Sequence, residues 1–221
     1  MCISAKVSLN VFSIGVILLL LLNILGNSQY KTHNLYLSFI FIFVILMQIV
    51  DYLIWKDIEC KNGFNKIAGI IGVLLNYLLP LIAYISFNYF MKVKNNRYNK
   101  LLLSLNIIYA VFLVYFLYNY YTKEKLCSTL VKGNISWSWY NTPLSPIINI
   151  FYCILLILNL LQGNNIYMLI VVIIIYVYLG IVMKLKQGVV GEFWCLGAPF
   201  LLIILLFCQH LLPNLKNLKL L

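Results

Sequence analysis

The feature that most constrains this chain is a series of apolar segments, each long enough to cross a lipid bilayer. A spanning helix needs roughly 20 predominantly apolar residues, and the sequence offers seven such segments joined by short connections. They cover residues 7–26, 34–55, 67–91, 101–121, 147–162, 166–183 and 193–212. The pattern predicts an all-α membrane protein, with one seven-transmembrane-helix bundle over residues 1–221.

Composition supports the same class of protein. Hydrophobic residues make up 64% of the chain and charged residues 10%, whereas soluble domains are about half apolar and about a quarter charged. A net charge of +11 would suggest nucleic acid in a soluble protein. Here the lysines fall in short loops, where lipid head groups and the topology rule explain them. We therefore expect the lipid bilayer as the partner and no nucleic acid.

The first segment has a second interpretation, a cleaved signal peptide, because Lys6 precedes it and small residues follow it. Its apolar stretch is long for a signal peptide, and Gly26-Asn27-Ser28 is a poor cleavage site. The sequence favours a retained helix.

The distribution of positive charge predicts an orientation. The loop from Lys92 to Lys100 holds four basic residues and no acidic one. Raw counts of Lys and Arg do not separate the two sides of the membrane, but the high density of basic residues in this loop does. Because dense positive charge stays in the cytoplasm, we expect this loop and the C-terminus inside and the N-terminus outside or in a lumen.

Features of the opposite loops agree with this orientation. Cys60 and Cys127 fall in two lumenal loops, where a disulfide is permitted. Cys195 is a competing partner, and three free thiols fit the sequence equally well. Asn134-Ile135-Ser136 is a candidate glycosylation sequon in the longest loop.

Polar residues within the second segment suggest a site. Gln48, Asp51 and Trp55 have the spacing of one helix face. Charged residues at membrane depth usually face the bundle interior and carry function. Asp51 is one turn from the end of its segment, so an interfacial carboxylate near water is an equally good interpretation.

Two prolines add irregular backbone. Pro80 cannot donate to the carbonyl of Asn76, and this should free that oxygen and kink the third segment. Pro199 does the same in the seventh segment, near Glu192 and Trp194. These positions predict a polar cavity open to the lumen between segments two, three and seven. The alternative is that the polar residues only join helices.

Other residue types suggest no cofactor. The stretch Trp137-Ser138-Trp139-Tyr140 is typical of an aromatic belt at the membrane interface, with a ligand lid as the weaker alternative. His33 and His210 have no second ligand at metal spacing, so we expect no zinc site.

A resemblance rests on residues 47–55, on Cys60, on residues 76–80 and on Phe193-Trp194-Cys195. With its Gln-x-x-acid…Trp pattern, later Pro and Trp-Cys pair, the chain resembles small uncharacterised seven-transmembrane proteins of large DNA viruses and protists. It departs from their pattern at Asp51, where Glu is expected, and at Leu79, where Gln is expected. The resemblance implies one seven-helix domain and brings no function with it.

Three classes of function remain. A transporter or channel for a small solute or ion is the preferred class, because kinked helices and a one-sided acidic mouth suit it. A structural or receptor-like interaction protein of the membrane suits polar residues that join helices. An intramembrane enzyme is the least supported, because the sequence has no nucleophile–base pair and no metal cluster.

Overall fold

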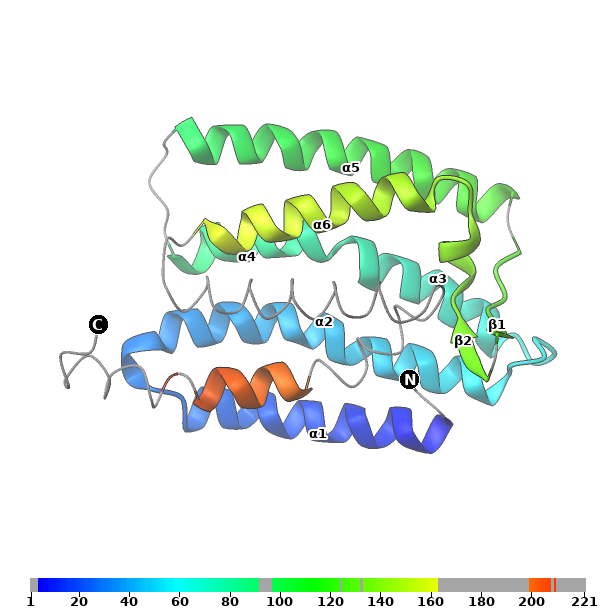
Figure 1. The fold of residues 1–221 in the computed structure, drawn as a ribbon, viewed down its shortest axis with the longest axis horizontal. Helices are drawn as coiled ribbons and strands as arrows, with labels where there is room; N and C mark the ends of the chain where they lie inside the picture. Colours follow the sequence, from blue (N-terminus) through cyan, green and yellow to red (C-terminus); the bar gives the residue numbers. More distant parts are fainter. Residues whose placement is uncertain are drawn as a thin grey trace.

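A computed structural model describes residues 4–91, 97–123, 125–131, 133–162, 199–207 and 209. In these residues the chain is helical apart from one small hairpin and the connecting loops (Figure 1). The sixth predicted segment, residues 166–183, lies outside the described residues, as do parts of the seventh.

The first two helices form an antiparallel pair. Helix α1 runs from Ala5 to Ile24, and α2 runs from Lys31 to Lys56 after the short 3-10 helix η1, Ser28–Tyr30. They pack closely at Gly15, where a Cβ atom would lie 2.8 Å from Cγ1 of Ile45. A larger side chain at residue 15 would therefore force the two helices apart.

The third predicted segment is two helices rather than one. Helix α3 spans Phe64–Tyr77, α4 spans Leu79–Met91, and the pair is bent by 47°. The predicted kink is therefore present, and it is sharp enough to separate the helices at Leu78. Pro80 causes the break because its nitrogen has no proton to donate to the preceding turn.

The remaining elements place a hairpin between two helices. Helix α5 is Arg97–Lys123 and α6 is Ser145–Leu161. Between them, strand β1 (Thr129–Val131) pairs antiparallel with β2 (Asn134–Ser136), with Leu130 opposite Ile135. The 3-10 helix η2, Ser138–Asn141, leads from the hairpin into α6.

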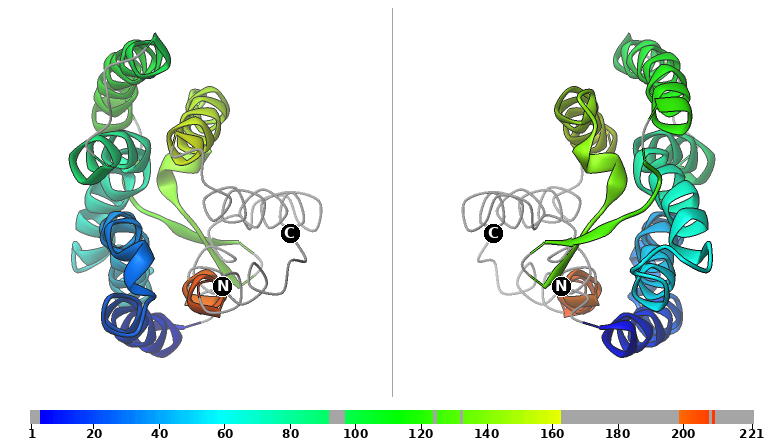
Figure 2. Two further views of the ribbon diagram at one scale, coloured as in Figure 1. Left: turned by 90° about the vertical axis from the view of Figure 1, so that its left-hand side faces the viewer. Right: turned by 90° about the vertical axis from the view of Figure 1, so that its right-hand side faces the viewer.

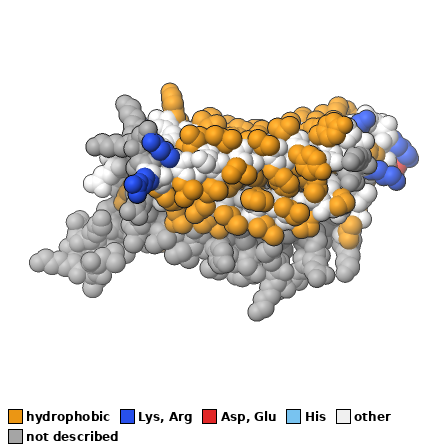
Figure 3. Space-filling view, turned by 90° about the horizontal axis from the view of Figure 1, so that it is seen from above, with side chains coloured by type: hydrophobic (Ala, Val, Ile, Leu, Met, Phe, Trp, Pro, Cys, Tyr) orange, Lys and Arg blue, Asp and Glu red, His pale blue; other side chains and the backbone are white. Residues whose placement is uncertain are grey.

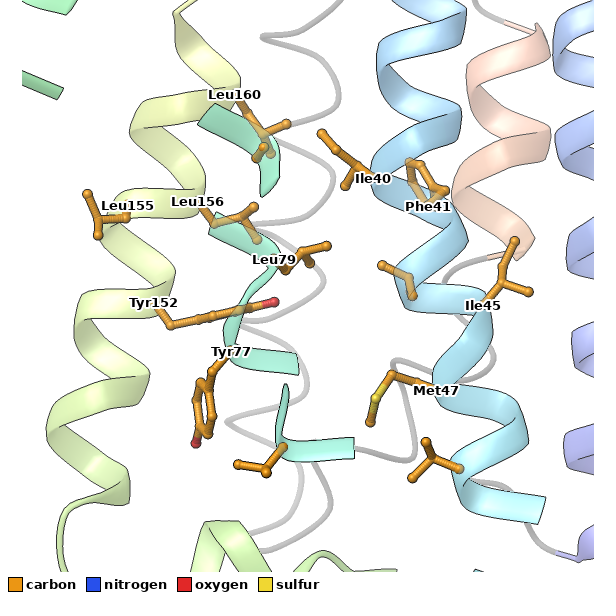
Figure 4. Packing of buried hydrophobic residues seen from close by; sticks show 14 of the residues in the cluster. Ile40, Phe41, Ile45, Met47, Tyr77, Leu79, Tyr152, Leu155, Leu156 and Leu160 are labelled. Atoms are coloured by element: carbon orange, nitrogen blue, oxygen red, sulfur yellow. The ribbon is translucent and has the colours of Figure 1, made fainter. Parts of the chain in front are cut away.

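The helices lie in two layers. In Figure 2, α1, α2, the α3–α4 pair and α5 form one curved layer, and α6 and the helical residues 199–207 lie on its concave side. The core between the layers is apolar: Ile40 and Phe41 of α2 lie across from Leu156 and Leu160 of α6 (Figure 4). The helices alternate in direction, so residues 57–65, 125–131 and 133–142 meet at one end of the bundle (Figure 1). We call these residues the cap.

The outer surface has the pattern of a membrane protein. On the face in Figure 3, hydrophobic side chains cover the middle and Lys and Arg side chains gather at the two ends. Among the described residues, three helices are long and apolar enough to cross a membrane, or four if the bent α3–α4 pair counts as one span. These spans indicate a multi-pass membrane protein in contact with lipid.

The seven predicted spans are therefore reduced to three or four candidates in the described part of the chain. Helix α6 corresponds to the fifth predicted segment but has only 17 residues. At 1.5 Å per residue it is about 26 Å long, which is shorter than the roughly 30 Å of a hydrocarbon core.

Candidate functional site

The polar face predicted on α2 points into the protein. Gln48 and Asp51 are each 2% exposed, and Trp55 is half-buried against the core. Asp51 is thus a buried carboxylate near the cap end of α2, and the alternative of an interfacial carboxylate open to water is wrong.

Trp137 of the cap binds Asp51. Its indole Nε1–H donates to Oδ1 of Asp51 at 2.7 Å, and both side chains are buried. This bond joins the segment after the hairpin to the buried face of α2.

The aromatic stretch of residues 137–140 is not an exposed belt. Trp137 and Trp139 are 3% and 0% exposed, and their rings stack with centroids 5.0 Å apart. Trp139 packs against Gly72 of α3, where a Cβ would lie 3.0 Å from Cζ3 of the indole. The predicted interfacial belt is therefore wrong, because these rings fill the space between α2 and α3.

A disulfide and paired hydrogen bonds hold the cap together. Cys60 is bonded to Cys127, with Cα atoms 6.2 Å apart and a sequence separation of 67. Next to it, the buried Asn65 donates to the carbonyl of Ser128 and accepts from the Ser128 N–H, both at 2.9 Å. Ser138 continues this network to the Tyr120 hydroxyl, 2.6 Å away.

Asp57 organises the start of α3. Its Oδ1 accepts from the backbone N–H groups of Lys61 and Asn62, at 2.8 and 2.9 Å, and its Oδ2 accepts from Asn65 N–H at 3.2 Å. The Asn62 N–H, followed by the other backbone donors, holds the pKa of this carboxyl below its ordinary value, although desolvation acts in the opposite direction. Asp57 thus stays ionised at the N-terminus of α3, where the helix dipole favours an anion.

The helix break is supported by groups from other helices. The Tyr109 hydroxyl of α5 donates to the Tyr77 carbonyl at 2.7 Å, and Nδ2 of Asn159 in α6 donates to the Pro80 carbonyl at 2.9 Å. The Leu78 N–H donates to the Leu74 carbonyl at 2.9 Å and is shared with the Asn76 carbonyl.

A small cavity lies beside the break. It offers about 10 Å³ to the centre of a water molecule. Its described lining comes from α2, from α3 and α4, from Trp137 and from Tyr152 of α6. In Figure 4, Met47 projects from α2 and Tyr152 from α6, on either side of Leu79. Gln48 and Asn76 lie on its wall, and Asp51 is joined to the wall through Trp137.

The amide of Asn76 is unusual in this setting. Asn76 is 4% exposed, yet no described atom completes a hydrogen bond to its Nδ2. The Tyr140 hydroxyl is near enough to interact with the Asn76 side chain. Buried amide donors are normally bonded, so this atom needs a separate explanation.

The other candidates are only partly placed. Pro199 is buried, whereas Glu192, Trp194 and Cys195 lie outside the described residues. Asn134 opens strand β2 directly after Gly133. Within the described ranges, no group of three His, Cys, Asp or Glu side chains could hold a metal ion.

Sequence reasoning missed Trp137 and Tyr152 as lining residues and the small hairpin before Trp137. The bond from Trp137 to Asp51 spans 86 residues, and neither side chain carries a local signal for the other. Comparisons of the chain with protein-family models, with curated proteins and with solved structures find no match.

Proposed function

We propose that this chain is a multi-pass membrane protein that acts through contacts made by its cap, as a receptor-like or structural interaction protein. The observation that carries the proposal is the cross-linking of the cap by the Cys60–Cys127 disulfide and the reciprocal Asn65–Ser128 bonds. A surface that is rigid before binding loses less entropy when a partner binds.

The cap also presents groups that a partner could contact. Strand β1 is exposed along its whole length, including the apolar side chains of Leu130 and Val131. Lys66 and Lys125 are exposed nearby. Exposed apolar residues rimmed by charge are typical of interaction surfaces.

The proposal places the cap on the outer or lumenal face of the membrane. The disulfide supports this orientation, because disulfides persist in oxidising compartments and are rare in the cytosol. The N-terminus of α1 lies at the same end, and the start of α5 at Arg97 lies at the other (Figure 1).

Epitope tags test the orientation. A tag before residue 4 should bind antibody on intact cells, where only the outer face of the membrane is accessible. A tag within residues 92–96 should bind antibody only after the membrane is permeabilised. The reverse pattern would contradict the orientation. Loss of an endoglycosidase-sensitive mass shift in Asn134→Gln would add a second, independent marker for the same side.

Photo-crosslinking tests the interaction. A photoreactive amino acid at Leu130 of the cap should give a discrete protein adduct in native membranes. The matched position is Val114 on α5, which is 68% exposed on an apolar helix and should react with lipid alone. The Leu130 adduct should weaken when Cys60 and Cys127 are replaced by Ser. Equal adducts at both positions, or none at Leu130, would contradict an interaction function.

A transporter or channel for a small solute or ion is the second candidate, and the helix break favours it. Gln48 and Asn76 bring two amides to a cavity wall at an irregular backbone, which is the arrangement that transporters use for their sites. Flux of protons, K⁺ or Na⁺ into liposomes that is lost in Asn76→Leu, with folding intact, would favour this function. Flux that is absent, or unchanged in the variant, would leave the interaction function in place.

A further inference from the structure

The cavity beside the helix break has one buried polar side chain of special interest on its wall, that of Asn76. The side chain comes from the last turn of α3, and the chain bends by 47° directly after it. Its Nδ2 is buried and no described acceptor meets it in hydrogen-bond geometry, the nearby Tyr140 hydroxyl included, although the residue lines the cavity. A buried donor without a partner costs about 1–3 kcal/mol, so a group that accepts from it would be held there.

The size of the cavity restricts the ligand. A water molecule needs roughly 10–15 Å³ of space for its centre, and the cavity offers about 10 Å³. Any ligand much larger than one water would have to displace the packed side chains of Val44, Leu75 or Leu79 on the wall.

The chemistry of the wall restricts it further. Nδ2 of Asn76 is a donor, so the ligand must accept a hydrogen bond, and this disfavours an ammonium or metal cation. A buried water also needs two to four polar partners. The amide of Gln48 and the hydroxyl of Tyr152 lie on the same wall, and an amide oxygen has two lone pairs with which to accept.

We propose that one ordered water molecule binds in this cavity, accepts from Nδ2 of Asn76 and bridges α3 to α2 through the Gln48 amide. The water takes the place of a side-chain partner at the point where the bend separates α3 from α4. It makes the hydrogen bonding of the break complete, together with Tyr109 and Asn159.

The experiment uses the full chain in lipid nanodiscs, with ¹⁵N-labelled asparagine. It measures magnetisation transfer between water protons and the side-chain amides by NMR. Asn106 is the matched control: it is 3% exposed, and its Nδ2 is bonded to the Leu102 carbonyl and to Oδ1 of Asn159. A direct water cross-peak is expected at the amide of Asn76, assigned by its loss in Asn76→Leu, and none is expected at Asn106.

A second variant tests the location without removing the amide. Val44→Ile adds one methylene to the cavity wall, which is about the space that a single water needs. The Asn76 cross-peak should disappear in this variant while the other asparagine signals keep their positions. A missing cross-peak in the wild type, equal cross-peaks at both asparagines, or a peak that persists in Val44→Ile would each overturn the proposal.

Discussion

The two ends of the bundle are held together by different chemistry. The cap has a disulfide, the ionised Asp57 and a hydrogen bond from Trp137 to Asp51. At the opposite end the ties are neutral amides: Gln209 bonds to Asn34 and accepts from Asn27 N–H at 3.2 Å, and Gln162 donates to Asn99 at 2.8 Å.

This difference shows how each end can respond to its surroundings. The disulfide and the buried Asp57 carboxylate hold the cap in one arrangement. Hydrogen bonds between neutral side chains in membrane proteins are worth about 0.6 kcal/mol on average, so the opposite end can rearrange at low cost. Motion of the bundle should therefore pivot about the cap.

The largest effect should come from removing the disulfide. Because Cys60 and Cys127 are 67 residues apart, their bond restricts the unfolded chain by at most about 4 kcal/mol. Spanning helices that persist in the unfolded state will lower this value. Cys60→Ser/Cys127→Ser should unfold at a lower SDS fraction in mixed micelles, whereas Cys153→Ser in α6, a free thiol, should not. Equal midpoints for all three proteins would show that the cap needs no covalent tie.

The next effect concerns the bond between Trp137 and Asp51. Trp137→Phe keeps an aromatic ring in the core and removes the indole donor to the carboxylate. We expect a loss of about 2 kcal/mol in the free energy of unfolding. Asp51→Asn keeps an acceptor oxygen and should lose less in the same unfolding measurement. If Trp137→Phe is as stable as the wild type, the hydrogen bond from Trp137 to Asp51 does not hold the cap more firmly than the amide bonds hold the opposite end.

A smaller effect is expected at the opposite end. Gln209→Leu removes the contacts to Asn27 and Asn34 and should cost about 1 kcal/mol. Hydrogen exchange should rise in the α1–α2 turn and stay unchanged in residues 57–65. Faster exchange in the cap would mean that the two ends are coupled rather than independent.

The smallest effect is the loss of the Asp57 contribution to stability, which is absent at neutral pH and grows as the pH falls. Its folded pKa is depressed by the backbone donors of Asn62, Asn65 and Lys61, so its contribution is complete above the ordinary carboxyl pKa. It is lost as the pH falls through the depressed folded value. Unfolding measured from about pH 6 to about pH 3 should show this acid loss in the wild type and less of it in Asp57→Asn. Identical pH profiles of unfolding for the wild type and Asp57→Asn would contradict this role of Asp57.

The sequence predicted what depends on local pattern. Helices α1, α2 and α5 follow their apolar segments within a few residues, and Pro80 marked the break because proline removes a backbone donor wherever it stands. Cys60 and Cys127 were one of several pairings that remained open.

The sequence did not predict what depends on distant partners. Asn65 and Ser128 are both ordinary polar residues in their segments, and their reciprocal bonds exist only because the loops after α2 and α5 meet. The hairpin was missed because its strands have only three residues each. The role of residues 137–140 was misread because aromatic residues suit both a membrane interface and a packed core.

The donors at the helix break also impose an order on biosynthesis. When α3 and α4 first enter the membrane, the helices that carry Tyr109 and Asn159 have not yet been made. The carbonyls of Tyr77 and Pro80 gain these side-chain donors only when α5 and α6 arrive. A nascent chain that stops before α6 would keep the Pro80 carbonyl without Asn159, and such a chain is the one that membrane quality control should retain and degrade.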